Sequence, residues 1–299
     1  MSRIIKIGTH SFATTHEEKV LFPRSWITKG DLLDYYQKIA PYLLPHIKNR
    51  PILMHRFENG IDHKGEFHHS IASPPEWIKI KKISNHKTKI TKNFRDCLLI
   101  NNPETLLYVI NECCIAPYVS LHSVDKLYLP DRMVFAIKAA PQVKFHFIKW
   151  AAERLKYQIE SMNAKAFVMS GEPNTLYIFV PLNGVDTYKQ VRHCAFGIAQ
   201  RVVYNYPHHI TLEHNPAKWN CRAFIDVNYN RIGATVIAPY AVIPITNITI
   251  ATPFEWSELI RIKPEKYTLN NIFKRLAQKP DPWKDIQTNS LSLCALNWI

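Results

Sequence analysis

Apolar residues follow two kinds of spacing along the chain, and each kind predicts a different element. They recur every three or four positions over about 143–162 and 185–204, which is typical of amphipathic helices. Compact apolar runs lie before, between and after these stretches and predict strands. The strands are expected within 130–141, at 164–169 and 176–180, and near 222–227 and 234–238. This order predicts a mixed α/β fold with hairpins, not a doubly wound parallel sheet.

Capping residues mark the helix starts in the first third of the chain. Thr28 followed by Asp31 is a variant of the capping box, and Pro41 is expected to bend the helix that follows or split it in two. A second helix is expected to begin at Asn102. Pro103 then occupies the first helical position, where its missing amide hydrogen costs nothing.

A strand is expected over 50–56, and a strongly basic stretch follows it. Residues 79–95 carry seven Lys or Arg side chains and no Asp or Glu. Isoleucine and lysine alternate at the start of this stretch, so we expect a strand pair with one solvated basic face and a turn at Asn85-His86. Such lysines either protect an exposed strand edge from aggregation or contact phosphates, and the pattern leaves both interpretations open.

Charge and composition narrow the class of partner. The chain has 299 residues and a formal net charge of +14, which favours a polyanion, nucleic acid before membrane, although a merely basic protein fits the same value. Its six cysteines form no Cys-x-x-Cys pair, so they indicate neither a zinc site nor a disulfide framework. We find no signal peptide and no apolar run long enough to span a membrane. We expect a cytoplasmic, nucleoid-associated monomer with no membrane partner.

Several motifs in a fixed order give a more specific signal. They include Lys19-Val-Leu-Phe-Pro, Arg56-Phe-Glu-Asn-Gly-Ile, Pro130-Asp-Arg, Ile232-Gly-Ala-Thr-Val-Ile-Ala-Pro-Tyr and Thr252-Pro-Phe-Glu-Trp. Together they resemble the polymerase domain of bacterial DNA ligase D, a branch of the archaeo-eukaryotic primase superfamily. The resemblance covers nearly the whole chain. It implies a primase-polymerase fold, with mixed or antiparallel central sheets flanked by helices.

The resemblance also implies how the chain is organised. We expect a single ligase-D-polymerase-like domain over 1–299, without ligase or nuclease domains. Its parts are expected to be an N-terminal α/β part with the basic strand pair, a catalytic-core-like part of the RRM type, and C-terminal helices that pack back. Their approximate boundaries are 1–125, 126–250 and 251–299.

The residues that carry the family's chemistry differ in this chain. Family members place Asp-x-Asp on the strand within 130–141 and a third Asp on a later strand, and these carboxylates hold two divalent metal ions. Here Ala136 and Lys138 take the first two positions, and only Asp226 remains. One carboxylate beside an ammonium has the wrong ligand number and charge for two magnesium ions. We expect lost nucleotidyl transfer, no cofactor, and either a Lys138–Asp226 ion pair or a Lys138 side chain that reaches solvent.

The family's nucleotide-binding motif, Ser-Gly-Gly-Lys/Arg-Gly-x-His, is also altered. Ser170 and Gly171 match it, whereas Tyr177 takes the place of the histidine. Glu172 and Pro173 replace part of the basic, glycine-rich turn. A carboxylate there repels a triphosphate, and a proline removes an amide donor. Ser170 and Gly171 are the nucleotide-binding candidates that remain.

The candidate DNA-binding residues are better preserved. In the family, two lysines grip the 5′-phosphate at a DNA gap or end, and Lys19 and Lys29 match them. Further contacts to DNA are expected from Arg56, Lys79, Lys81, Lys87 and Lys89. The aromatic residues Phe57, Phe67 and Tyr118 either stack on bases or belong to the core.

Three functions remain open from the sequence. The first is an inactive polymerase-fold protein that binds 5′-phosphorylated DNA ends or gaps in non-homologous end joining. The resemblance implies Ku and a DNA ligase as its partners. The second is an active primer-extending polymerase that uses manganese or magnesium through atypical ligands. The third is a protein-interaction module that no longer binds nucleic acid. Loss of the Asp-x-Asp pair favours the first.

Overall fold

The computed structural model describes residues 3–84, 94–140 and 142–296. The chain divides into two compact units. The first unit combines Met1–Ser120 with Thr235–Ile250, and the second combines Leu121–Ala234 with Ala251–Ile299. The chain therefore leaves the first unit after residue 120 and returns to it for one short segment before it completes the second.

The first unit is built on a four-stranded antiparallel sheet. Its strands, in spatial order, are β15 (Thr235–Ile237), β9 (Cys114–Ser120), β5 (Ile52–Arg56) and β6 (Glu66–His68). Four two-stranded ladders accompany it: β1 (Ile4–Ile7) with β2 (His10–Ala13), β3 (Val20–Phe22) with β4 (Ile27–Thr28), β7 (Ile80–Ser84) with β8 (Phe94–Leu98), and β16 (Val242–Ile243) with β17 (Thr249–Ile250). The β7–β8 ladder confirms the strand pair expected in the basic stretch. The expected turn at Asn85-His86 lies outside the described residues.

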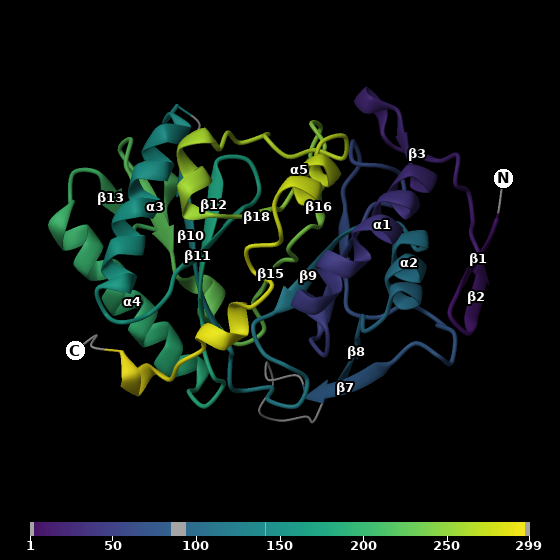
Figure 1. Cartoon of the computed structure of the whole chain (residues 1–299), viewed down its shortest axis with the longest axis horizontal. Coiled ribbons are helices and arrows are strands. Elements are labelled where there is room, and N and C mark those ends of the chain that lie inside the picture. The colour runs from purple at the N-terminus through teal and green to yellow at the C-terminus, as the bar shows by residue number, and fades with distance from the viewer. Residues whose placement is uncertain (1–2, 85–93, 141, 297–299) are drawn as a thin grey trace. The chain divides into compact units, whose positions relative to one another are not determined.

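Two helices, α1 (Lys29–Ile47) and α2 (Pro103–Asn111), pack against each other in the first unit (Figure 1). Both predicted caps are confirmed. The Thr28 hydroxyl accepts a hydrogen bond from the Asp31 amide at 3.2 Å and the Asp31 carboxylate accepts one from the Thr28 amide at 2.8 Å. The Asn102 side chain accepts a hydrogen bond from the Thr105 amide at 2.9 Å.

Of the two outcomes expected at Pro41, a bend or a split, the split is excluded because α1 continues to Ile47. Pro41 and Pro45 both lie on its exposed face, one turn apart. A proline removes the hydrogen bond to the carbonyl four residues earlier, and on this face water can satisfy the freed carbonyls. The buried face then keeps the helix intact through its packing.

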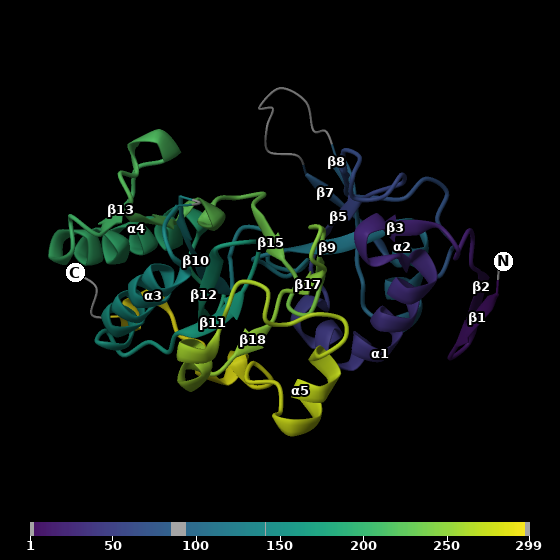
Figure 2. The same ribbon diagram turned by 90° about the horizontal axis from the view of Figure 1, so that it is seen from above.

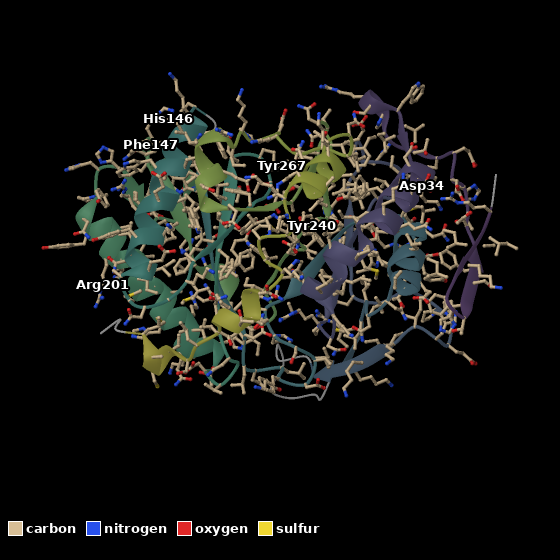
Figure 3. All side chains as sticks on the ribbon, in the orientation of Figure 1. Asp34, His146, Phe147, Arg201, Tyr240 and Tyr267 are labelled. Atoms are coloured by element: carbon tan, nitrogen blue, oxygen red, sulfur yellow. The ribbon has the colours of Figure 1, made fainter. Side chains whose placement is uncertain are left out.

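Two tyrosines fix that buried face of α1. The Tyr36 hydroxyl donates to the Ile115 carbonyl at 2.6 Å and accepts from the Val242 amide at 3.0 Å. The Tyr35 hydroxyl donates to the carbonyl of Tyr240, which is labelled in Figure 3, at 2.7 Å. Burial raises the pKa of both tyrosines well above the ordinary value, so both remain neutral donors. These bonds join α1 to β9 and to the returning segment 235–250.

The second unit contains a six-stranded sheet with two helices packed on it. The strands, in spatial order, are β13 (Ile210–Thr211), β14 (Ala223–Asp226), β10 (Arg132–Ala139), β12 (Thr175–Pro181), β11 (Phe167–Ser170) and β18 (Pro253–Phe254). All neighbours are antiparallel except β13 and β14. Helices α3 (Phe145–Glu160) and α4 (Tyr188–Asn205) contact each other and strand β10 (Figures 1 and 2). The mixed α/β fold with largely antiparallel sheets is confirmed.

The complete burial of β12 accounts for its continuous run of mostly apolar residues. All seven of its residues are buried, as expected for a strand that has neighbours on both edges and packed layers on both faces. Beyond the sheet, the C-terminal helices expected within 251–299 include a 3₁₀ helix, Trp256–Arg261, and α5 (Ile272–Gln278). Further 3₁₀ turns are Pro23–Ser25, Pro216–Lys218, Asn228–Asn230, Ile286–Asn289 and Leu293–Ala295. No helix within the described ranges is both long enough and apolar enough to cross a membrane.

Candidate functional site

The positions of the family's catalytic motifs meet on one face of the six-stranded sheet. Ala136 on β10 lies opposite Tyr177 on β12 and opposite Asp226 on β14. Lys138, two residues further along β10, lies opposite Thr175. Residues that lie opposite each other on antiparallel strands share a face, as do alternate residues of one strand. The three sequence motifs therefore lie on one face of the sheet.

Lys138 and Asp226 form the predicted ion pair. The Lys138 ammonium lies 3.2 Å from Asp226 Oδ2 and 3.3 Å from the Tyr229 hydroxyl. The other carboxylate oxygen, Asp226 Oδ1, accepts a hydrogen bond from the Asn228 amide at 2.9 Å. The side chains of Lys138 and Asp226 are only 30% and 15% exposed. Both oxygens of the remaining carboxylate are thus engaged within the protein.

The Lys138 ammonium is a stable charge at this place. Burial opposes that charge, but Tyr229 and Asp226 outweigh it, and the pKa of Lys138 is raised above its ordinary value. The ammonium also lies 5.1 Å from the centroid of the Tyr229 ring, within the range of a cation–π contact. A charged ammonium is therefore held between Asp226 and Tyr229, at a position to which the resemblance assigned a metal ligand.

Tyr177 extends this network to a second carboxylate. Its hydroxyl donates to Glu172 Oε2 at 2.7 Å and lies 3.1 Å from the Tyr229 hydroxyl, which can then donate to it. The Tyr177 and Tyr229 rings meet edge to face, with centroids 5.4 Å apart. Burial first, and then Glu172 and Tyr229, raise the pKa of Tyr177 well above its ordinary value, so it remains neutral. A continuous chain of hydrogen bonds thus joins Lys138 to Glu172. We call the residues of this network the Lys138 cluster: Lys138, Tyr229, Tyr177, Glu172 and Asp226.

The two remaining nucleotide-binding candidates are covered. Ser170 is 7% exposed, and its amide and hydroxyl both bond to the backbone of Thr252 on the neighbouring segment, at 3.0 and 3.2 Å. A Cβ atom on Gly171 would collide with Tyr177 Cε2, so the Tyr177 ring packs directly on this glycine. Tyr177 therefore occupies the space beside the Ser170-Gly171 turn.

Asn230 positions the turn that carries Tyr229, and the sequence reasoning missed both residues. Asn230 is fully buried, and its side chain accepts from the Val134 amide at 2.8 Å and donates to the Val134 carbonyl at 2.7 Å. A further bond to the Val227 carbonyl, 3.0 Å long, closes the turn. The signal was present in the sequence as Asn-Tyr-Asn two residues after Asp226, but its partners on β10 come from far along the chain.

The side chains at this place do not fit a pair of divalent metal ions. Within the described residues, no group of three or more His, Cys, Asp or Glu side chains is arranged to hold a metal ion. Two-metal centres need several oxygen ligands and excess negative charge. The Lys138 cluster instead offers one carboxylate whose two oxygens are already bonded, with an ammonium beside it.

The predicted 5′-phosphate lysines lie in the first unit and have neutral partners. The Lys29 ammonium donates to Thr15 Oγ1 at 2.9 Å and to the Asn111 carbonyl at 3.0 Å, and the Lys29 residue is 1% exposed. The half-buried Lys19 donates to the Glu58 backbone carbonyl at 2.8 Å. Burial lowers the pKa of Lys29; the nearby Cys113, Glu112 and Glu17 partly oppose this shift, and the charge of Lys19 adds to it. No salt bridge within the described ranges involves either lysine; we call Lys19 and Lys29 the lysine pair.

The other predicted DNA contacts differ in their surroundings. The Arg56 guanidinium donates to the Glu112 carbonyl at 2.7 Å and pairs with the Glu58 carboxylate at 2.9 Å, so its charge is compensated. Lys79 and Lys81 are exposed, just before and within β7. Lys87 and Lys89 lie outside the described residues.

The aromatic candidates divide between core and surface. Phe57 is 6% exposed and belongs to the core, whereas Phe67 is 53% exposed. The Phe67 ring stacks on His55, with centroids 4.1 Å apart and planes 13° from parallel, and meets Tyr118 edge to face at 5.7 Å. Phe67 is therefore the aromatic side chain of this set that solvent reaches most.

These features together define a protein of the primase-polymerase class. A family model described as the LigD primase-polymerase domain matches residues 28–283, and the chain belongs to this family. The recognised resemblance is thereby confirmed. The match covers both the lysine at 29 and the whole Lys138 cluster.

Relatives of known name are similar over most of this chain. The multifunctional non-homologous end joining protein LigD of Mycolicibacterium smegmatis is 25% identical over 270 residues, which are 89% of this chain and 35% of that protein. The bifunctional non-homologous end joining protein LigD of Bacillus subtilis is 22% identical over 278 residues, 92% of this chain and 44% of that protein. The chain thus spans less than half the length of these two relatives.

A solved structure supports the same fold. The polymerase domain of Mycobacterium tuberculosis ligase D, in complex with DNA, matches with a TM-score of 0.84 and 22% sequence identity. The match covers 93% of this chain and 98% of that chain. The likeness shows that the two chains share the primase-polymerase fold.

Proposed function

We propose that this protein binds 5′-phosphorylated DNA ends or gaps in non-homologous end joining and does not transfer nucleotides. Family membership supports the association with end joining, since the named relatives are end-joining proteins. The structurally similar polymerase domain was solved with DNA, and the net charge of +14 favours a polyanionic partner. Ku and a DNA ligase are the partners this role implies, in a cytoplasmic, nucleoid-associated setting.

The observation that carries the loss of catalysis is the Lys138–Asp226 ion pair. A divalent ion at Asp226 would have to displace an ammonium 3.2 Å from the carboxylate or tolerate its repulsion. It would also find Oδ1 already bonded to the Asn228 amide. The ammonium balances the carboxylate without a metal ion, so we expect no bound magnesium or manganese at this place.

The lysine pair supports binding of a 5′-phosphate. Its two ammonium groups bond to neutral oxygens, so their charge is left for an external anion. Phosphate oxygens form short, charge-assisted hydrogen bonds with such groups. Lys19 is the member that water reaches, and Lys29 adds positive charge from beneath the surface.

The test is a titration of labelled gapped DNA by fluorescence anisotropy. Two substrates differ only in a phosphate or a hydroxyl at the 5′ side of the gap. We expect about tenfold tighter binding to the phosphorylated substrate, which corresponds to about 1.4 kcal/mol. Equal affinities for the two substrates would contradict the proposed end recognition.

A further inference from the structure

The C-terminal part of the second unit carries a basic surface that the sequence reasoning did not single out. Residues 258–279 hold six Lys or Arg residues but only two acidic ones, Glu258 and Glu265. This segment includes the end of the 3₁₀ helix Trp256–Arg261 and all of α5, drawn in yellow-green in Figures 1 and 2. We call its cations the C-terminal basic patch: Arg261, Lys263, Lys266, Lys274, Arg275 and Lys279.

The cations of this patch surround two hollows in the surface. The larger hollow, of about 640 Å³, is lined by Arg261, Lys263 and Lys266, by Pro173 and Asn174 of the altered turn, and by one acid, Glu265. The smaller one, of about 250 Å³, is lined by Lys266, by Lys274, Arg275 and Lys279, and by one acid, Glu258. Lys266 lines both hollows, so the basic surface is continuous from one to the other.

Buried residues hold part of the patch in place. Tyr267, labelled in Figure 3, is 6% exposed and lies between two cations, with Lys266 Nζ 5.5 Å and the Arg275 guanidinium 5.3 Å from its ring centroid. Glu258 pairs with Arg275 at 3.2 Å and with Lys279 at 3.5 Å. Three of the six cations, Lys266, Arg275 and Lys279, are therefore held in place by buried neighbours.

The remaining charge of the patch is strongly positive. Glu258 is shared by Arg275 and Lys279, and no salt bridge in the described part of the chain involves any of the other four cations. Those four residues are Arg261, Lys263, Lys266 and Lys274. Burial lowers the pKa of Lys266; the charge of Glu258 opposes this shift, whereas the charges of Arg261, Arg275 and Lys279 add to it. This crowding of like charges favours the approach of an anion.

We propose that the C-terminal basic patch binds the phosphate backbone of DNA, as a contact separate in sequence from the lysine pair. Its length over two joined hollows suits a row of phosphates better than a single phosphate. Its exposed members, Arg261, Lys263, Lys274 and Lys279, are mostly lysines, a residue type depleted at protein–protein interfaces. The patch's aromatic residue, Tyr267, is buried beneath its cations and offers no anchor to a protein partner. The inference rests on the proposed DNA binding.

The test compares two triple variants of the full chain that remove equal charge. One changes the patch, Arg261→Gln, Lys263→Gln and Lys274→Gln; the other changes exposed lysines elsewhere in the second unit, Lys165→Gln, Lys189→Gln and Lys218→Gln. Binding to the phosphorylated gapped duplex is measured by anisotropy from 50 to 200 mM salt. Each lost phosphate contact should reduce the slope of log K against log salt by roughly 0.9, so the patch variant should lose about 2 to 3. The control variant should lose about 0.5 or less.

The ratio of the affinities for the 5′-phosphate and 5′-hydroxyl substrates tests the proposed function separately from this inference. The patch variant should bind both gapped substrates about ten to a hundred times more weakly while keeping the ratio between them. A patch variant that unfolds at the wild-type temperature and keeps the wild-type salt slope would overturn the inference and leave end recognition standing. A patch variant that keeps the wild-type salt slope but no longer binds an acidic protein would also overturn the inference. In that case the patch would be a protein-binding surface. A wild-type chain that binds neither substrate would remove the proposed function and this inference together.

Discussion

The Lys138 cluster and the lysine pair differ in whether an acidic side chain lies at hydrogen-bond distance from the ammonium groups. In the cluster, the Lys138 ammonium lies 3.2 Å from a carboxylate and a further hydrogen bond joins it to a tyrosine. In the lysine pair, Lys19 and Lys29 meet only neutral oxygens at hydrogen-bond distance. A charge that is compensated inside the protein needs no ligand, whereas an uncompensated one favours an anion from outside. This difference is the basis of the proposed function, in which a binding surface is kept and a catalytic one is lost.

Among the variants considered, placing carboxylates at positions 136 and 138 should change the free energy of unfolding the most. In the double variant Ala136→Asp, Lys138→Asp, three carboxylates share one face of the sheet, and position 136 is fully buried. We expect the free energy of unfolding to fall by about 3 to 5 kcal/mol, the usual cost of buried charge without a partner. Urea denaturation measures this loss.

Adding Mn²⁺ should show whether the double variant is destabilised by its unpaired carboxylates or by steric strain. A metal ion that binds only the folded state raises its stability, so Mn²⁺ should recover part of the loss in the double variant. The matched variant Ala136→Asn, Lys138→Asn has similar shape without the carboxylates and should not respond. A wild-type chain that Mn²⁺ stabilises as much as the double variant would contradict the account.

Removing one hydroxyl from the cluster should have an intermediate effect. Tyr177→Phe keeps the ring packed on Gly171 but takes away the bond to Glu172 and the contact with Tyr229. We expect a loss of about 2 kcal/mol in unfolding free energy, because buried polar groups are left without that partner. Tyr157→Phe, at a position 76% exposed, is the control and should change stability little. Equal stability of both variants would show that the network is not structural.

Removing the accessible charge of the lysine pair should affect binding rather than stability. Lys19→Gln is expected to weaken binding of 5′-phosphorylated gapped DNA about tenfold, or about 1.4 kcal/mol, with little change for the 5′-hydroxyl substrate. Lys6→Gln removes an exposed lysine of the same unit and serves as the control. If both variants weakened both substrates equally, Lys19 would act only through the general charge.

The smallest expected effect is a pH dependence in the first unit. Burial lowers the pKa of His55 to about 4, whereas an unfolded histidine titrates near 6.5. Because the native pKa is depressed, this stabilising contribution is present above pH 6.5 and is lost as the pH falls toward 4. The ring is only half-buried, so we expect a loss of about 1 kcal/mol. His55→Phe should flatten that part of the stability profile, and an unchanged slope would contradict the assignment.

Local signals predicted much of the fold, and the family resemblance predicted one contact of the site. The caps at Thr28 and Asn102 depend on neighbours three residues away, and both are confirmed. The resemblance assigned Lys138 and Asp226 to metal-ligand positions of the family, and the ion pair expected from that assignment is confirmed.

Other features depend on partners that only the folded chain brings together. Tyr229 and Asn230 act through β10, about ninety residues earlier, and no local pattern reveals that contact. The continuity of α1 through Pro41 depends on which face meets solvent. The six cations of the C-terminal basic patch lie within 258–279 of the sequence, but only the fold shows that Lys266 and Arg275 meet at the Tyr267 ring.

The most direct test of the central claim is a primer-extension assay on gapped, 5′-phosphorylated DNA with Mn²⁺ or Mg²⁺ and both ribonucleotides and deoxynucleotides. The polymerase domain of a named relative serves as the positive control. We predict no extension by this protein under conditions in which it binds the same DNA. Extension that disappears in the Asp226→Ala variant would contradict the account, because it would mean that Asp226 still supports nucleotidyl transfer beside Lys138.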